Sequence, residues 1–201
     1  RNKLSKVPAE AKREALIKHV QTSGLETLPF TPEIRQWQAR VELVRANADY
    51  KTWPDVSSER LLASMNDWLG PYLEPVNLLS HFKKLDLKSI LTALLTWEQN
   101  QQLNALAPQR LQVPSGSSYS IDYTTTPPVL AVKLQEMFGC VDTPAVLNGQ
   151  IPLTVHLLSP AGRPLQVTQD LAGFWQTSYL DVRKEMKGRY PKHPWPKDPQ
   201  N

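Results

Sequence analysis

The stretch that decides the fold is Leu111-Gln-Val-Pro-Ser-Gly-Ser-Ser-Tyr-Ser-Ile-Asp-Tyr123. Its apolar residues alternate with polar ones on both sides of the turn-forming segment 114–118, which is typical of a β-hairpin. Before Pro108 the apolar residues recur every three or four positions, as they do in amphipathic helices, and after it they follow strand spacing. The sequence therefore predicts a helical bundle over residues 1–107 and a small α+β module over residues 108–201.

The predicted bundle consists of helices that begin at capping residues. Thr31 is followed by a proline and then by a regular apolar stripe, a strong helix start. Another helix is predicted to begin at Ser57 or Ser58 and to continue through Leu69. The polar run at residues 98–102 is expected to connect the last helix to the α+β module.

The second half is predicted to form a mainly antiparallel sheet of four or five strands. An apolar strand is expected over residues 129–134, and a second hairpin is expected around the turn at residues 160–164. Asp170 is expected to cap one long helix that ends at Gly188. The predicted fold class is therefore α+β, with the long helix at the C-terminus.

Composition excludes several classes of protein. The chain has 201 residues, of which 40% are hydrophobic and 21% are charged, the balance of an ordinary globular chain. No window of 18 residues is continuously apolar, so we expect no membrane span. The single cysteine excludes an internal disulfide. The chain begins at Arg1 without a leader-like segment, and we expect it to be an internal or C-terminal fragment of a longer protein.

The sequence carries no recognisable catalytic motif. None of the eight glycines is followed by lysine, so a phosphate-binding loop is absent, and no dinucleotide-binding glycine motif is present. The four histidines are far apart in the sequence and lack metal-ligand spacing. Cys140 has no basic neighbour that would lower its pKa. We therefore expect no catalytic residue, no metal and no cofactor in this fragment.

Positive charge is concentrated in residues 183–197. Six Lys and Arg residues stand there against Glu185 alone, so this segment carries a net charge of +5 and the other 186 residues sum to −1. Aromatic residues lie between the cations, a combination that single-stranded nucleic acid grooves use for phosphates and bases. Arg163, at the tip of the second predicted hairpin, extends the candidate surface. The candidate nucleic-acid-binding residues are Arg163, Arg183, Lys184, Lys187, Arg189, Tyr190, Lys192, His193 and Trp195.

Two other interpretations apply to the same segment. It can be a strap that docks the Trp195 ring on the core while its lysines are merely solvated. It can also be a site for a partner protein. The strap and the nucleic-acid surface are compatible with each other.

Several runs of residues resemble the C-terminal region of HrpB-type bacterial ATP-dependent helicases. They follow one another in order and cover nearly all of residues 53–199, and the stretch before them resembles the helical part that precedes this region in the same family. The recognisable runs are Trp53–Ser57, Leu111–Ser117, Ile121–Tyr123, Pro128–Gly139, Leu157–Trp175 and Val182–Pro196.

The resemblance implies a protein of the DEAH/RHA group whose ATPase motor lies N-terminal to this fragment. ATP and Mg²⁺ are then cofactors of the full-length protein, and a cytoplasmic location is expected. The family's motor motifs find no matching residue here, so no catalytic residue is carried over. The expected role is an accessory region that assists RNA binding beside the motor domains of the same chain. The alternative is a bracing or protein-interaction element that does not touch RNA.

Overall fold

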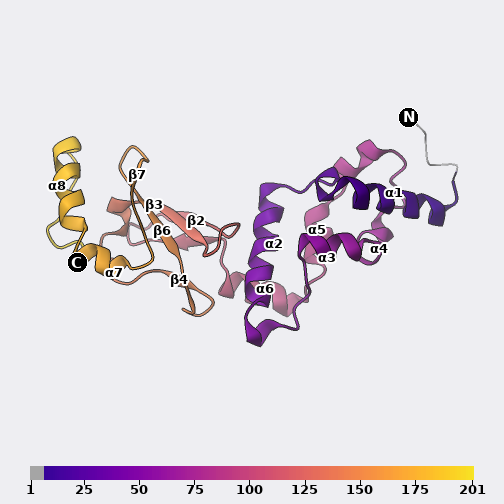
Figure 1. Cartoon of the computed structure of the whole chain (residues 1–201), viewed down its shortest axis with the longest axis horizontal. Helices are drawn as coiled ribbons and strands as arrows, with labels where there is room; N and C mark the ends of the chain where they lie inside the picture. Colours follow the sequence, from indigo (N-terminus) through magenta and orange to yellow (C-terminus); the bar gives the residue numbers. More distant parts are fainter. Residues whose placement is uncertain (1–6) are drawn as a thin grey trace. The chain divides into compact units, whose positions relative to one another are not determined.

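The computed structural model describes residues 7–201, which form two compact units, one ending at Leu103 and the other beginning at Asn104. Helices make up the first unit, and a sheet with two helices makes up the second (Figure 1). The second unit begins before Pro108, where the apolar spacing changes, because the last turn of helix α6 (Trp97–Leu106) bonds to it. The Leu106 carbonyl oxygen accepts a hydrogen bond from the Leu147 N–H, at 2.8 Å.

The helices of the first unit begin and end at residues that the sequence marks. The Thr31 hydroxyl accepts a hydrogen bond from the Ile34 N–H at 3.3 Å, which confirms the predicted cap. Gly24 has φ 97° and its N–H donates to the Val20 carbonyl oxygen at 2.7 Å, so this glycine ends the first helix. The elements are α1 (Ala9–Ser23), η2 (Leu25–Thr27), α2 (Pro32–Arg45), η3 (Ala48–Tyr50), α3 (Ser58–Ala63), α4 (Met65–Trp68), η4 (Gly70–Tyr72), η5 (Leu79–Lys84), α5 (Leu87–Thr92) and α6.

Two parts of the first unit differ from the sequence prediction. The helix that begins after Ser57 is interrupted at Ser64, where φ is −100° and ψ is 15°, and this residue separates α3 from α4. The polar run at residues 98–102 is helical within α6. Thr96 and Gln99 stabilise its start, since each side chain accepts a hydrogen bond from the other residue's N–H, at 3.1 and 3.0 Å.

A five-stranded sheet forms the centre of the second unit, in the order β1-β2-β3-β6-β7. The sheet is mixed, which corrects the prediction of a mainly antiparallel sheet. Strands β3 and β6 are parallel neighbours because the chain between them returns to the starting end of β3 before β6 begins. The strands are β1 (Arg110–Gln112), β2 (Ser118–Asp122), β3 (Val129–Lys133), β6 (Thr154–Leu158) and β7 (Pro164–Thr168).

Both predicted hairpins are confirmed, as β1–β2 and β6–β7. The connection from β3 to β6 contains η6 (Leu134–Met137) and a further hairpin, β4 (Ala145–Val146) with β5 (Ile151–Pro152). The sequence carries no signal for this hairpin because its strands, of two residues each, are too short to show alternation. Its turn uses positive φ angles at Leu147, Asn148 and Gly149, of 51°, 54° and 84°.

Two helices follow the sheet where the sequence predicts one long helix. Asp170 caps α7 (Leu171–Gln176), since its carboxylate accepts a hydrogen bond from the Gly173 N–H at 3.0 Å. Thr177 then leaves the helical conformation, with φ −121° and ψ −85°. Its hydroxyl donates to the Gly173 carbonyl oxygen at 2.7 Å, a side-chain bond that adds to the backbone bond at the end of α7. The chain resumes as α8 (Tyr179–Arg189).

The core of the second unit has an aliphatic and an aromatic part. Alternate sheet residues are buried on one face, as strands β3 and β6 show with their patterns of exposed and buried positions. The aromatic part is centred on Phe138, whose ring lies 6.0 Å from Trp175, 6.0 Å from Tyr179 and 6.3 Å from Trp195, measured between centroids. The contacts with Tyr179 and Trp195 are edge-to-face and the contact with Trp175 is tilted, and aromatic contacts of this kind fix the position of the rings.

Candidate nucleic-acid interface

Helix α8 presents one face to the core and the other to solvent. Tyr179 and Met186 are completely buried, and they lie seven residues apart on the inner face. The helix ends when the Tyr190 N–H donates to the Met186 carbonyl oxygen at 2.7 Å, and Pro191 cannot continue it. Residues 190–201, here called the C-terminal segment, then follow an irregular path.

Side chains and amides of the core hold the C-terminal segment through its carbonyl oxygens. The Tyr179 hydroxyl donates to the Pro196 carbonyl oxygen at 2.6 Å, and the Gly139 N–H donates to that of Pro199 at 2.7 Å. Proline has no N–H, but its carbonyl is a full acceptor. The proline-rich C-terminal segment is therefore held on the second unit by hydrogen bonds that its carbonyl oxygens accept.

The side chains of Trp195 and Arg183 also donate hydrogen bonds to carbonyl oxygens of the C-terminal segment. The Trp195 side chain is 6% exposed, and its indole N–H donates to the Tyr190 carbonyl oxygen at 2.9 Å. Arg183 is half-buried, and its Nε donates to the Trp195 carbonyl oxygen at 2.8 Å. In this conformation the Trp195 ring offers no free face to a base, and Arg183 stabilises the C-terminal segment.

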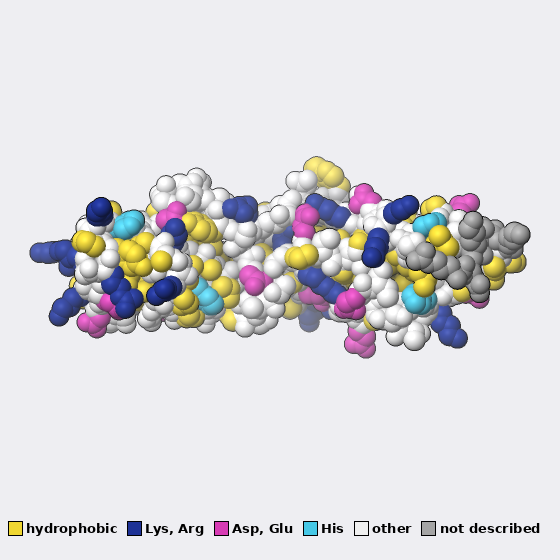
Figure 2. Space-filling view, turned by 90° about the horizontal axis from the view of Figure 1, so that it is seen from above, with side chains coloured by type: hydrophobic (Ala, Val, Ile, Leu, Met, Phe, Trp, Pro, Cys, Tyr) yellow, Lys and Arg dark blue, Asp and Glu magenta, His cyan; other side chains and the backbone are white. Residues whose placement is uncertain are grey.

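The exposed cations lie on the other side of α8 and just after it. Lys184 and Lys187 are exposed and three residues apart, so they share one face of the helix. Arg189 is exposed and lies 3.7 Å from Glu185 in an ion pair that is more than half exposed, which has little energetic weight. Figure 2 shows Lys and Arg side chains gathered over α8, at the left of the view. The basic surface is defined here as Lys184, Lys187, Arg189 and Lys192.

His193 connects the C-terminal segment to the sheet. Its Nδ1 lies 2.9 Å from Nε2 of Gln135, a residue of η6. The exposed His193 ring also lies edge-on to Tyr190, which is half-exposed, with 6.1 Å between centroids. Because η6 follows β3 directly, this contact brings the C-terminal segment next to the end of β3 that carries Lys133.

Arg163 lies at the tip of the β6–β7 hairpin, as the sequence indicates. The turn is closed by the Ser159 N–H, which donates to the Arg163 carbonyl oxygen at 2.8 Å, and by Gly162 with φ 81°. The register pairs Lys133 with Leu158 and Leu158 with Pro164, so Lys133 and Arg163 lie at the same end of the sheet. Sequence reasoning missed Lys133, although strand alternation places it on the outer face.

The described residues show no site for metal or thiol chemistry. Within residues 7–201, no group of three or more His, Cys, Asp or Glu residues could hold a metal ion. Burial raises the pKa of the Cys140 thiol, and nearby Asp142 adds to this, which keeps the sulfur protonated and weakly nucleophilic. No helix in the same range is long and apolar enough to cross a bilayer.

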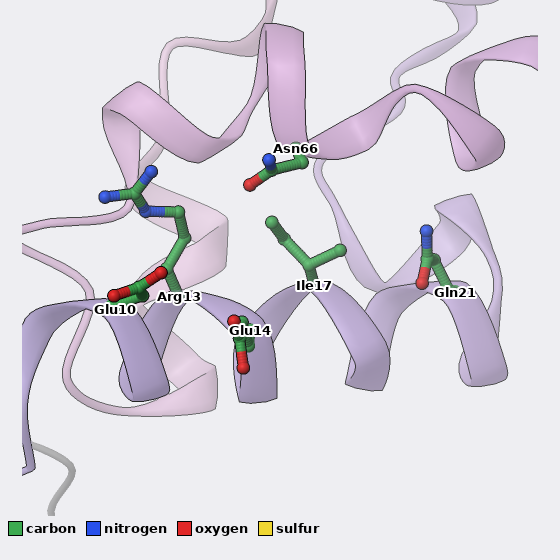
Figure 3. Close-up of a pocket in the computed structure, with 6 residues that line it drawn as sticks. All are labelled: Glu10, Arg13, Glu14, Ile17, Gln21 and Asn66. Atoms are coloured by element: carbon green, nitrogen blue, oxygen red, sulfur yellow. The ribbon is translucent and has the colours of Figure 1, made fainter.

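A shallow pocket lies in the first unit, between α1 and α4 (Figure 3). Its lining mixes both signs of charge, and Gln21 already donates from Nε2 to the Leu62 carbonyl oxygen at 2.9 Å. Its lining residues include two glutamates, Glu10 and Glu14, but no histidine, cysteine or serine that could act as a nucleophile beside them. The lining residues are Glu10, Arg13, Glu14, Ile17, Gln21 and Asn66.

Comparison with known proteins identifies close relatives. Residues 68–199 match the protein family described as "ATP-dependent helicase C-terminal". The chain is 42% identical over 199 residues to the "ATP-dependent RNA helicase HrpB" of Escherichia coli K12, which covers 98% of this chain and 25% of that protein. The chain therefore spans about a quarter of the length of this relative.

Two solved structures agree with this match. One, of the E. coli DExH-box NTPase HrpB, superposes with a TM-score of 0.90 at 41% identity and covers 98% of this chain and 24% of its own. The other, of the Escherichia coli DEAH/RHA helicase HrpB, superposes with a TM-score of 0.78 at 39% identity and covers 96% and 24%.

Proposed function

The chain belongs to the ATP-dependent helicase C-terminal family, as the C-terminal region of an HrpB helicase, and on this premise we propose that it assists RNA binding beside the motor of the same protein. In this proposal the motor, outside this chain, binds ATP and Mg²⁺ and hydrolyses the nucleotide, and the whole protein acts in the cytoplasm. The present region is a non-catalytic accessory that contributes part of the RNA path.

The basic surface is the observation that carries this proposal. Lys184, Lys187 and Lys192 are exposed, and among the described residues none of the three forms an ion pair. Exposed cations that are not neutralised by the protein's own acids are available to phosphates. Residues 183–197, which contain this surface, carry a net charge of +5, whereas the other 186 residues sum to −1, so the net positive charge of the chain comes from this segment.

Salt-dependent binding tests the proposal. The fluorescence anisotropy of a labelled single-stranded RNA of about 12 nucleotides is measured with the 201-residue chain between about 50 and 200 mM salt. We expect the affinity to fall steeply across this range, because each phosphate that the protein neutralises releases a counterion. Absence of binding at the lowest salt, or binding that salt leaves unchanged, would contradict the proposal.

The second candidate function is a docking element for the motor, and Trp97 favours it. This side chain is 75% exposed at the start of α6, where the capping pair of Thr96 and Gln99 holds the first turn in place. An exposed tryptophan on a fixed helix end is a typical anchor of protein interfaces. No lysine or arginine lies between residues 89 and 109, so this position is unsuited to phosphate.

A matched pair of variants tests the docking function in the longer natural protein. Trp97→Ala removes the anchor, whereas Gln101→Ala changes an exposed residue of the same helix. Docking predicts that only the first variant increases proteolytic cleavage between this region and the motor, with RNA affinity unchanged. Equal cleavage of both variants would exclude Trp97 as an anchor.

A further inference from the structure

One face of the five-stranded sheet is not part of the buried core. Along β3, Leu130 and Val132 are completely buried, whereas Ala131 and Lys133 between and beyond them are exposed. Along β6 every second residue is likewise buried, and the residues between are half-exposed. Because side chains of a strand alternate between the faces, the sheet has one inner and one open face.

The register joins the open residues into rows across three strands. Ala131 pairs with His156, and His156 pairs with Val167, whose side chain is 55% exposed. Neighbouring strands lie about 5 Å apart, so this row is a continuous floor of mostly apolar atoms roughly 10 Å wide. The β6–β7 register shifts by one residue between Leu157 and Leu158, so Leu158 pairs with Pro164 and not with Leu165. The outer sheet face is defined here as Ala131, Lys133, His156, Leu158, Val167 and, through this shift, Pro164.

Positive charge lies at one end of this floor. The second row consists of Lys133, Leu158 and Pro164, and Arg163 precedes Pro164 directly. Among the described residues neither Lys133 nor Arg163 takes part in an ion pair. The outer sheet face therefore combines a flat apolar floor with two available cations.

We propose that the outer sheet face binds single-stranded RNA, an assignment that rests on the proposed function and extends it to a second site. Phosphates contact Lys133 and Arg163, and unstacked bases lie on the floor formed by Ala131, His156 and Val167. An A-form duplex buries the faces of its bases and offers only its backbone, its 2′-hydroxyls and the base edges in its grooves, whereas a single strand can lay its bases on a sheet. The apolar floor therefore favours single-stranded over double-stranded RNA as the ligand of this face.

The position of the outer sheet face supports one continuous path. Lys133 ends β3, and Gln135, two residues later, contacts His193 of the C-terminal segment at 2.9 Å. Lys192 of the basic surface is the neighbour of His193. An RNA strand that leaves the sheet at Lys133 thus meets the basic surface next. Its phosphates can then contact cations from the tip of the β6–β7 hairpin to the end of α8.

Two exposed valines provide the test, in anisotropy titrations of the 201-residue chain with a labelled single strand and with a duplex of the same sequence. Val167→Glu places a negative charge on the floor, and Val141→Glu places the same charge on another exposed valine of the unit, which is 46% exposed. We expect Val167→Glu to weaken single-strand binding about tenfold, as the removal of one stacked base does. Duplex binding by this variant and all binding by Val141→Glu should stay within about twofold of the unsubstituted chain.

A second pair tests Lys133, one of the two phosphate-binding cations, and guards against a folding defect. Lys133→Glu should weaken single-strand binding, and Lys83→Glu, an exposed lysine of the first unit, should not. Equal effects within both pairs, or equal affinity of the unsubstituted chain for duplex and single strand, would overturn the site while leaving the proposed function intact. Absence of salt-dependent binding to either RNA would overturn the proposed function and the site together.

Discussion

The Nε of Arg183 donates a hydrogen bond to the carbonyl oxygen of Trp195, 2.8 Å away. This bond joins the middle of α8 to the C-terminal segment, which returns along the helix after Tyr190. The indole of Trp195 closes the same loop by donating to the Tyr190 carbonyl oxygen at 2.9 Å. Arg183 and Trp195, both candidate RNA-binding residues, therefore stabilise the fold. In the proposed function the lysines of the basic surface contact the phosphates.

Replacing Trp195 should destabilise the second unit. We expect Trp195→Ala to lower the free energy of unfolding by about 3–5 kcal/mol, because it removes a buried ring and leaves a cavity. The matched variant Trp97→Ala changes a ring that is 75% exposed and should alter stability by less than about 0.5 kcal/mol. Urea unfolding followed by circular dichroism measures both. Similar reductions in the two variants would contradict the strap arrangement.

Replacing Arg183 should lower the stability of the fold more than replacing Arg189, because only Arg183 is hydrogen-bonded to the C-terminal segment. Arg183→Ala removes the bond to Trp195 and should lower the free energy of unfolding by about 1 kcal/mol. Arg189→Ala breaks an exposed pair and should change it by less than about 0.5 kcal/mol. Limited trypsin digestion reports the same difference, since release of the C-terminal segment frees the backbone around the exposed Lys192 and Lys197 to enter the protease site. Unaltered stability and digestion in Arg183→Ala would show that the bond has no structural role.

The two lysines of α8 should set the salt dependence of RNA binding. Replacing both Lys184 and Lys187 by alanine should reduce the slope of log affinity against log salt by about 0.7 for each phosphate of a single strand that the variant no longer neutralises. The double variant of Lys83 and Lys84, both exposed in the first unit, is the control and should keep the slope of the unsubstituted chain. Slopes from anisotropy titrations decide the matter. Equal slopes in the two double variants would remove α8 from the RNA path.

Tyr179 should make the stability of the fold around the C-terminal segment sensitive to alkaline pH. Burial raises the pKa of the Tyr179 hydroxyl, an effect that Arg183 partly offsets, so the folded state retains a proton that the unfolded chain loses above about pH 10. Its contribution to stability is therefore complete below that pH and is lost as the pH rises through the folded-state pKa. Tyr179→Phe lacks the bond to Pro196 and should be less stable by about 1 kcal/mol at about pH 7.

The pH series distinguishes this effect from general alkaline denaturation. The stability difference between the unsubstituted chain and Tyr179→Phe should shrink when urea unfolding is repeated above about pH 10, since only the former carries the titrating hydroxyl. A difference that stays constant from neutral to alkaline pH would show that this group does not titrate during unfolding.

Local signals were sufficient for most of the elements. The caps at Thr31 and Asp170 and both predicted hairpins depend on residues within a few positions of each other, and the structure confirms them. The prediction of one long C-terminal helix was wrong because Thr177 leaves the helical conformation, and the apolar residues on either side of it keep helical spacing, so the sequence does not mark this break. The parallel pairing of β3 with β6 had no local signal, because it depends on the path of the chain between them.

The sequence by itself determined the alternation of the strands, the helix starts and the concentration of positive charge after residue 183. Only the tertiary structure decided which of these residues are available to a ligand. Trp195 is buried and Arg183 is hydrogen-bonded to its carbonyl oxygen, whereas Lys184 and Lys187 are exposed. The strand register also places Lys133 at the same end of the sheet as Arg163. The physical reason is that propensity, capping and turn chemistry act between near neighbours in the chain. Burial, and the partner that a polar group finds, depend on residues brought together from distant parts of it.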